Sequence, residues 1–232
     1  MMVGDPSMWA DRFRSIDTRF LQCVVAVWTR CVAILPVQPD EDTITINLVD
    51  ILSKDPNARR LFHYLEYQHE PFGHTEDGIA YSKGKIDMAV LLDQERERYL
   101  AYECKRLNVI HNGKKSSLAT PYVTEGLSRF VTEQYAENLP VGCMLGYVLD
   151  GEVNDAHSKV HAAIVSRKSE IALSAGPTQD NEIGEVRRFF SCHVRSSNGH
   201  EIEVRHALLP FPKKSSEKAK VVAQAGSPPS AK

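Results

Sequence analysis

The chain has 232 residues, of which 42% are hydrophobic and 25% are charged, and its formal net charge is -2. This composition is typical of a globular protein with one sizeable core, and any affinity for a polyanion must come from local basic patches. No apolar run approaches the roughly 20 residues of a membrane helix, and the N-terminus lacks a signal-peptide pattern, so we expect a cytoplasmic protein without membrane association.

Cysteine usage argues against a disulfide framework or a structural zinc site. The cysteines form an odd set without CxxC spacing, and free cysteine packs as a small hydrophobe. We therefore expect buried free thiols at Cys23, Cys31, Cys104, Cys143 and Cys192.

The first third of the chain is predicted to be helical. Apolar residues recur at steps of three and four from Trp9 to Leu35, which is typical of an amphipathic helix docked on a core. A second helical stretch follows Asp42. Asp55-Pro56 resembles an N-cap followed by a first-turn proline, so we predict a third helix from there to about Gln68.

The pattern then changes to that of strands. Residues 85–92 and 99–106 are short alternating or apolar runs separated by a charged stretch, and they predict an antiparallel pair. Later signals predict an Asn112-Gly113 turn, a helix over 120–138, a buried strand over 141–149, a helix over 154–167, and a hairpin of strands 187–195 and 201–209.

Together these elements predict one α/β domain with a central mixed β-sheet flanked by helices. The domain spans residues 1–212, with a helical N-terminal part over 1–70 and the core sheet and helices over 79–212. Residues 213–232 contain almost no large apolar side chain, so burial would not offset the entropy lost on ordering them. We expect this segment to be a disordered tail.

Three charged residues on the first two predicted strands carry the chemistry. Side chains alternate along a strand, so Glu103 and Lys105 project from one face while Tyr102 and Cys104 point the other way. Asp87 lies opposite the apolar face of its own strand, and pairing through the charged loop permits it to approach Glu103. Two converging carboxylates suit Mg²⁺ or Mn²⁺, and a lysine beside them can stabilise charge on a phosphate or orient the attacking water.

This arrangement resembles the D…ExK core of the PD-(D/E)xK, or restriction-endonuclease-like, nuclease superfamily. The resemblance covers about residues 81–150, although Ile86 stands where the family name has proline. It implies that Asp87 and Glu103 bind metal and that Lys105 is catalytic. It further implies a Mg²⁺- or Mn²⁺-dependent endonuclease or exonuclease, with DNA favoured over RNA, that leaves a 5′-phosphate and a 3′-hydroxyl.

Many members of this superfamily add a metal-binding carboxylate from the preceding helix. Glu66, beside the apolar stripe of the third predicted helix, is the candidate here. A helix-surface role for Glu66 is the alternative, and Glu70 and Asp77 compete with it.

Basic residues near the motif are candidates for nucleic-acid contacts. Arg129 lies four residues after Glu125, which is the spacing of a surface ion pair; the alternative is that it faces the site and holds a phosphate. The other candidates of this kind are Arg106, Lys114, Lys115 and the Arg187-Arg188 pair.

Histidines gather on the last predicted hairpin. His193, His200 and His206 lie near Cys192, but their spacing fits no common zinc pattern. His193 and Arg195 share a strand face, so we instead expect both to line a substrate cleft.

The predicted function is phosphodiester hydrolysis in phage defence or DNA repair, with nucleic acid as the partner and a further subunit or a homodimer left open. Two alternatives remain. One is a non-catalytic nucleic-acid-binding or assembly subunit of the same fold, and the other is a protein-interaction module that uses the N-terminal helix as its partner surface. Both predict indifference to the loss of Asp87, Glu103 and Lys105.

Overall fold

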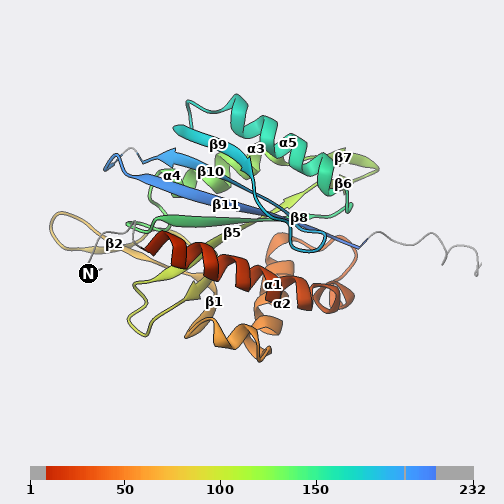
Figure 1. The fold of residues 1–232 in the computed structure, drawn as a ribbon, viewed down its shortest axis with the longest axis horizontal. Coiled ribbons are helices and arrows are strands. Elements are labelled where there is room, and N and C mark those ends of the chain that lie inside the picture. Colours follow the sequence, from red (N-terminus) through yellow and green to blue (C-terminus); the bar gives the residue numbers. More distant parts are fainter. Residues whose placement is uncertain (1–8, 196, 213–232) are drawn as a thin grey trace, which may run out of the picture.

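The structure is a computed structural model that describes residues 9–195 and 197–212. The predicted α/β class is confirmed, because helices cover both faces of a seven-stranded central sheet (Figure 1). The predicted tail over 213–232 lies outside the described residues. The helices are α1 (Ala10–Ile34), α2 (Glu41–Lys54), α3 (Ala119–Pro121), α4 (Ser128–Val131) and α5 (Val153–Ser166), with a 3₁₀ turn at Ala58–Arg60 and a π-helix at Tyr122–Leu127.

The central sheet is mixed, as predicted. Its strand order is β1-β4-β5-β8-β11-β10-β9, in which β5, β8 and β11 run parallel and the other neighbours are antiparallel. Hairpins β2–β3 and β6–β7 form separate two-stranded sheets. The strands are β1 (Tyr64–His69), β2 (Phe72–His74), β3 (Ala80–Ser82), β4 (Ile86–Leu91), β5 (Tyr99–Leu107), β6 (Val109–His111), β7 (Lys114–Ser116), β8 (Val141–Val148), β9 (Leu173–Gln179), β10 (Arg187–Val194) and β11 (Glu201–Pro210).

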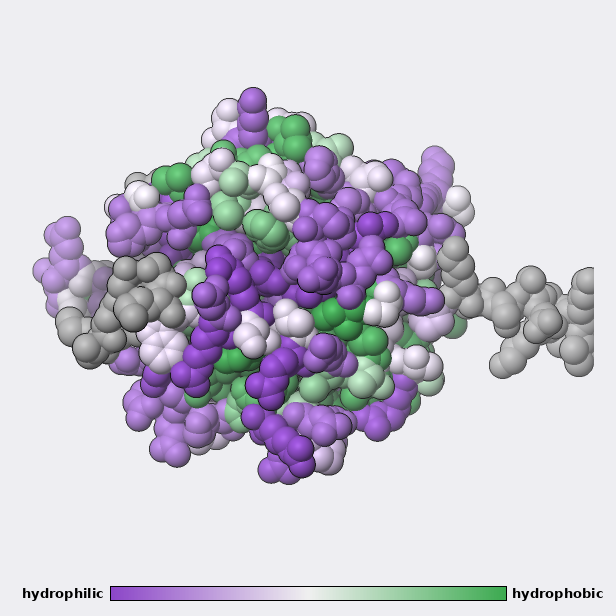
Figure 2. Space-filling model, viewed as in Figure 1, coloured by the Kyte–Doolittle hydropathy of each residue, from purple (hydrophilic) through white to green (hydrophobic). Residues whose placement is uncertain are grey.

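The N-terminal amphipathic helix is confirmed as α1, which lies with α2 on one face of the sheet, while α3, α4 and α5 lie on the other (Figure 1). Its apolar stripe packs into the core of the protein itself, where Phe13, Phe20 and Trp28 are buried. Figure 2 shows mostly hydrophilic side chains between small hydrophobic areas on the face in view. The helix therefore does not present its apolar stripe to a partner.

The predicted helix from Asp55 to Gln68 is wrong, and with it the helical character of the chain up to residue 70. The carboxylate of Asp55 accepts the N–H groups of Asn57 and Ala58, but only the 3₁₀ turn forms before strand β1 begins. Strand β1 pairs antiparallel with β4 along its length. This tertiary pairing outweighs a local cap signal that contributes about 1 kcal/mol.

The helix predicted over 120–138 is shorter and irregular. Its α- and π-helical turns end at Val131, and positive φ angles at Glu133, Ala136 and Asn138 then turn the chain. Strand β9 was not predicted, because its small and polar residues lack an alternating pattern; it forms by pairing with β10 at the sheet edge. The hairpins β4–β5 and β10–β11, the buried strand β8 and helix α5 are confirmed.

The cysteines are free thiols, as predicted, although Cys23 and Cys192 are only partly buried. No helix in the described part of the chain combines the length and the apolar character that crossing a bilayer requires.

Candidate active site

The pairing of β4 with β5 opens at Asp87, and this opening forms the candidate site. The backbone ladder between the two strands ends with Met88 opposite Tyr102. Beyond that point Oδ2 of Asp87 accepts the backbone N–H of Cys104 at 2.7 Å. Since this contact holds Asp87 beside the residue that follows Glu103, and the charge of Asp87 acts on Glu103, the structure brings together the two carboxylates whose approach the sequence only permitted.

Glu103 and Lys105 lie on one face of β5, as their spacing predicts. The side chain of Glu103 is 0% exposed, and its Oε1 lies 2.7 Å from Nζ of Lys105. The π-helix covers both side chains: a Cβ added at Gly126 would lie 3.4 Å from Cγ of Glu103 and 3.5 Å from Cγ of Lys105. Such helical irregularities are frequent at functional sites.

Arg129 faces the site rather than pairing with Glu125. Its NH1 lies 3.1 Å from Oε1 and 3.2 Å from Oε2 of Glu103. The same nitrogen donates to the hydroxyl of Tyr135 at 2.6 Å, and the guanidinium lies 5.3 Å from the centre of the Tyr135 ring. Tyr135 in turn donates to the backbone carbonyl of Lys85, two residues before Asp87. The alternative in which Arg129 faces the site is therefore the one that the geometry supports.

Sequence reasoning missed Glu41, the first residue of α2. Its Oε1 accepts from Nζ of Lys105 at 2.9 Å, and its Oε2 accepts the backbone N–H of Arg106 at 2.9 Å. The signal available in the sequence was the run Asp40-Glu41-Asp42 at a helix start, where carboxylates are favoured. That run does not indicate which strand the start of the helix contacts.

The prediction that Glu66 lies on a helix before the motif is wrong. Glu66 lies on strand β1, where its carboxylate is 2.7 Å from Nδ1 of His69 and 2.6 Å from NH2 of Arg96. Its competitors Glu70 and Asp77 are exposed. The additional carboxylate that reaches Lys105 comes from α2, whereas residues 64–69, predicted to be helical, form the edge strand β1.

Burial is the largest single influence on the pKa values of Glu103, Asp87 and Lys105. It raises the pKa of Glu103 to about 8, with the charge of Asp87 adding to the effect and Lys105 and Arg129 opposing it. Burial also raises the pKa of Asp87, against the charge of Lys105. Burial lowers the pKa of Lys105, but the charges of Glu103, Glu41 and Asp87 together hold it above its usual value. Lys105 therefore stays an ammonium beside a carboxylate that takes up a proton near neutral pH.

The carboxylates fit a hydrated metal ion better than a closed metal cage. Mg²⁺ prefers oxygen ligands and often uses only one or two protein carboxylates beside its waters, which Asp87 and Glu103 can supply. The buried Oε1 of Glu103 lies 2.7 Å from Nζ of Lys105 and 3.1 Å from NH1 of Arg129, so this oxygen faces cations, and a metal ion would have to displace one of them. Among the described residues, no three histidine, cysteine, aspartate or glutamate side chains are placed to enclose a metal ion.

Several predicted nucleic-acid contacts are corrected by burial and pairing. His193 is 0% and Arg195 2% exposed, so neither lies on an open cleft beside the carboxylates. Lys115 lies 2.6 Å from both Asp150 and Asp155 and is held by them.

Three other basic candidates differ in burial and pairing. Arg106 donates from NH1 to the carbonyl of Pro39 at 3.3 Å and is half-buried, whereas Lys114 is exposed on β7. Arg188 is buried and paired with Asp17. Within the described part of the chain, Lys114 makes no ion pair, so its charge is available on the surface.

Two of the late histidines, His193 and His206, form a buried hydrogen-bond chain, whereas His200 is exposed. His193 Nδ1 lies 2.8 Å from the carbonyl of Ile171, and Ser191 Oγ links Nε2 of His193 to Nε2 of His206 at 2.8 and 3.0 Å. Nδ1 of His206 lies 3.0 Å from the hydroxyl of Tyr122. Burial lowers the pKa of both histidines, so the chain is neutral.

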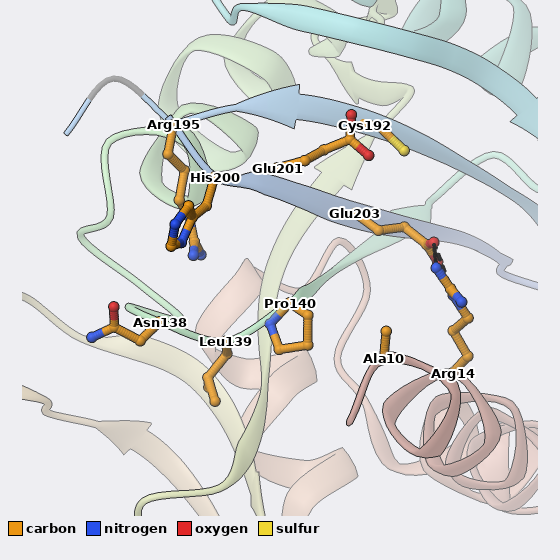
Figure 3. Close-up of a pocket in the computed structure, with 10 residues that line it drawn as sticks. All are labelled: Ala10, Arg14, Asn138, Leu139, Pro140, Cys192, Arg195, His200, Glu201 and Glu203. Carbon is orange, nitrogen blue, oxygen red and sulfur yellow. Dashed lines mark hydrogen bonds and ion pairs between the residues drawn. The ribbon is translucent and has the colours of Figure 1, made fainter. Parts of the chain in front are cut away.

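A separate pocket of about 390 Å³ lies near the starts of β8 and β11 (Figure 3). Arg195 and His200 project into it, while Glu203 is turned to Arg14, 2.7 Å away. Arg195 also donates to the carbonyls of Phe130 and Ala136, which anchors the loop after α4. Charges of both signs line the pocket, so it does not suit a polyanion.

Comparison with protein-family models, with curated proteins and with solved structures finds no match for this chain. Its function is therefore inferred from the geometry of the site.

Proposed function

We propose that this chain is a Mg²⁺- or Mn²⁺-dependent nuclease of the PD-(D/E)xK type with a restriction-endonuclease-like core. The observation that supports it is the convergence of Asp87, Glu103 and Lys105 where β4 and β5 part. These residues do not decorate a solvated sheet face, because Glu103 is fully buried and a buried charge is costly unless it has a partner.

Each residue then has a role that follows from its position. Asp87 and Glu103 would hold the metal ion, and Glu41 lies near Asp87 as a third carboxylate. When bound, the metal supplies Lewis-acid stabilisation and lowers the pKa of a coordinated water. Lys105, held by Glu41, presents its ammonium to the charge that develops on the phosphate or to the attacking water.

The substrate and biological role are carried over from the resemblance alone. It favours DNA over RNA, allows endonuclease or exonuclease action, and suggests phage defence or DNA repair in the cytoplasm. A partner subunit or a homodimer would supply specificity that so small a domain has little room to encode.

The test is cleavage of single-stranded, duplex and supercoiled DNA and of RNA with Mg²⁺, Mn²⁺ or EDTA. We expect Glu103→Ala and Lys105→Ala to lose activity by orders of magnitude while remaining folded, since metal and electrostatic effects each contribute several kcal/mol. Glu76→Ala and Lys168→Ala, at exposed positions, are the matched controls and should cleave like the wild type. Equal cleavage by all five proteins would contradict the proposal.

A non-catalytic nucleic-acid-binding subunit is the second candidate. One observation favours it: Lys105 and Arg129 already neutralise Glu103 without a metal ion. In that case no metal produces cleavage, and Glu103→Ala binds DNA in EDTA as the wild type does.

A further inference from the structure

We propose that Arg129 is a displaceable counter-ion of Glu103, which gives up the carboxylate when a divalent cation binds and is released toward the substrate phosphate. The inference rests on the proposed function, because it concerns how the same site exchanges one cation for another. It assigns to Arg129 a positioning role that links metal binding to phosphate binding.

The hydrogen bonds of Arg129 to Glu103 and Tyr135 go through one nitrogen. NH1 lies 3.1 Å from Oε1 and 3.2 Å from Oε2, and it also donates to Tyr135 at 2.6 Å. Both carboxylate distances are longer than the 2.7 Å between Lys105 and Oε1. Of the two cations that balance the charge of Glu103, Arg129 is therefore the more weakly held.

The remaining donors of Arg129 are uncommitted. Within the described residues, Nε and NH2 of Arg129 have no acceptor, and the side chain is 33% exposed. Lys105 is 14% exposed and bonds to Glu41 and to the carbonyl of Cys104 as well as facing Glu103. Of the two cations at Glu103, Arg129 is the more exposed, and its Nε and NH2 are available to a phosphate.

A metal ion and a guanidinium on the same carboxylate repel each other. The repulsion is strong here because Glu103 is 0% exposed and little water screens it. The ring and hydroxyl of Tyr135 hold the guanidinium at the site when NH1 leaves the carboxylate. A phosphate bound to Arg129 would by reciprocity raise the affinity for the metal ion.

The experiment is calorimetric titration of Mg²⁺ into the protein without nucleic acid, above pH 8 so that Glu103 is ionised. We expect Arg129→Gln, which removes the competing charge, to bind Mg²⁺ about tenfold more tightly or better. Arg129→Lys keeps the charge and should stay much nearer to the wild type. Arg167→Gln is the matched control, because Arg167 is 34% exposed and its NH1 pairs with Glu170 at 2.7 Å, away from the site.

A second measurement needs no variant. Phenylglyoxal modifies accessible guanidinium groups, so Mg²⁺ should increase labelling of Arg129, read by mass spectrometry, and leave labelling of Arg167 unchanged. Unchanged or weaker Mg²⁺ binding in folded Arg129→Gln, with normal binding by the wild type, would overturn the inference and leave the proposed nuclease intact. If neither protein binds Mg²⁺, the proposed metal-dependent function itself fails, and the inference fails with it.

Discussion

Oε1 of Glu41 accepts a hydrogen bond from Nζ of Lys105 at 2.9 Å, although the two residues are 64 positions apart in the chain. The other carboxylate oxygen accepts the backbone N–H of Arg106. One side chain at the start of α2 thus holds both the ammonium and the strand that carries it. It does so along the part of β5 that lies beyond its ladder with β4.

We expect Glu41→Gln to lower the proposed nuclease activity by about 10–100-fold, the usual effect of removing a partner that orients active-site ligands. The neutral amide keeps the size of the side chain but loses the charge that attracts Lys105. Cleavage rates at saturating Mg²⁺ measure the effect. Glu66→Gln is the control, since Glu66 pairs with His69 and Arg96 on β1, and a larger loss there than at Glu41 would restore Glu66 as the additional carboxylate.

The protonation of Glu103 predicts how stability depends on pH. Burial raises its pKa from 4.5 to about 8, so the folded protein binds this proton more tightly than the unfolded chain does. The contribution to stability is fully present below 4.5 and is lost as the pH rises through about 8.

Without metal, the free energy of unfolding should therefore fall across this window by up to about 1.4 kcal/mol per pH unit from this group. Urea unfolding in EDTA measures it. Glu103→Gln should flatten the dependence, whereas the exposed control Glu76→Gln should not. If the free energy of unfolding depends on pH in the same way in the wild type and in Glu103→Gln, the pKa of the Glu103 carboxyl is not raised.

A second electrostatic cluster should matter for stability and not for chemistry. Asp17 is 1% exposed and accepts from NH2 of Arg188 at 2.9 Å, from Nε of Arg205 at 2.8 Å and from the hydroxyl of Tyr102 at 2.8 Å. Asp17→Ala leaves two buried guanidinium groups without this partner, and we expect a loss of about 3–5 kcal/mol in the free energy of unfolding.

The control is Asp11→Ala, which removes an exposed pair with Arg14 and should change stability by about 0.5 kcal/mol or less. Chemical denaturation compares both variants with the wild type. A loss at Asp17 as small as that at Asp11 would mean that the buried network contributes no more than a surface pair.

The sequence by itself determined features that depend on spacing within one element. Alternation along a strand placed Glu103 and Lys105 on one face, and the Lys–Glu contact of 2.7 Å agrees with it. The period of apolar residues likewise determined α1, and the apolar runs determined β4, β5 and β8. These patterns follow from backbone geometry, which is the same in every protein.

Only the tertiary structure decided which elements meet. Residues 64–69 form a strand because they pair with the backbone of β4. Glu66 therefore lies outside the site, and Glu41 of α2 contacts Lys105 instead. Arg129 turned to Glu103, and His193 became buried, through packing between segments far apart in the chain. Such contacts depend on the summed burial and pairing of many residues, which local spacing does not encode.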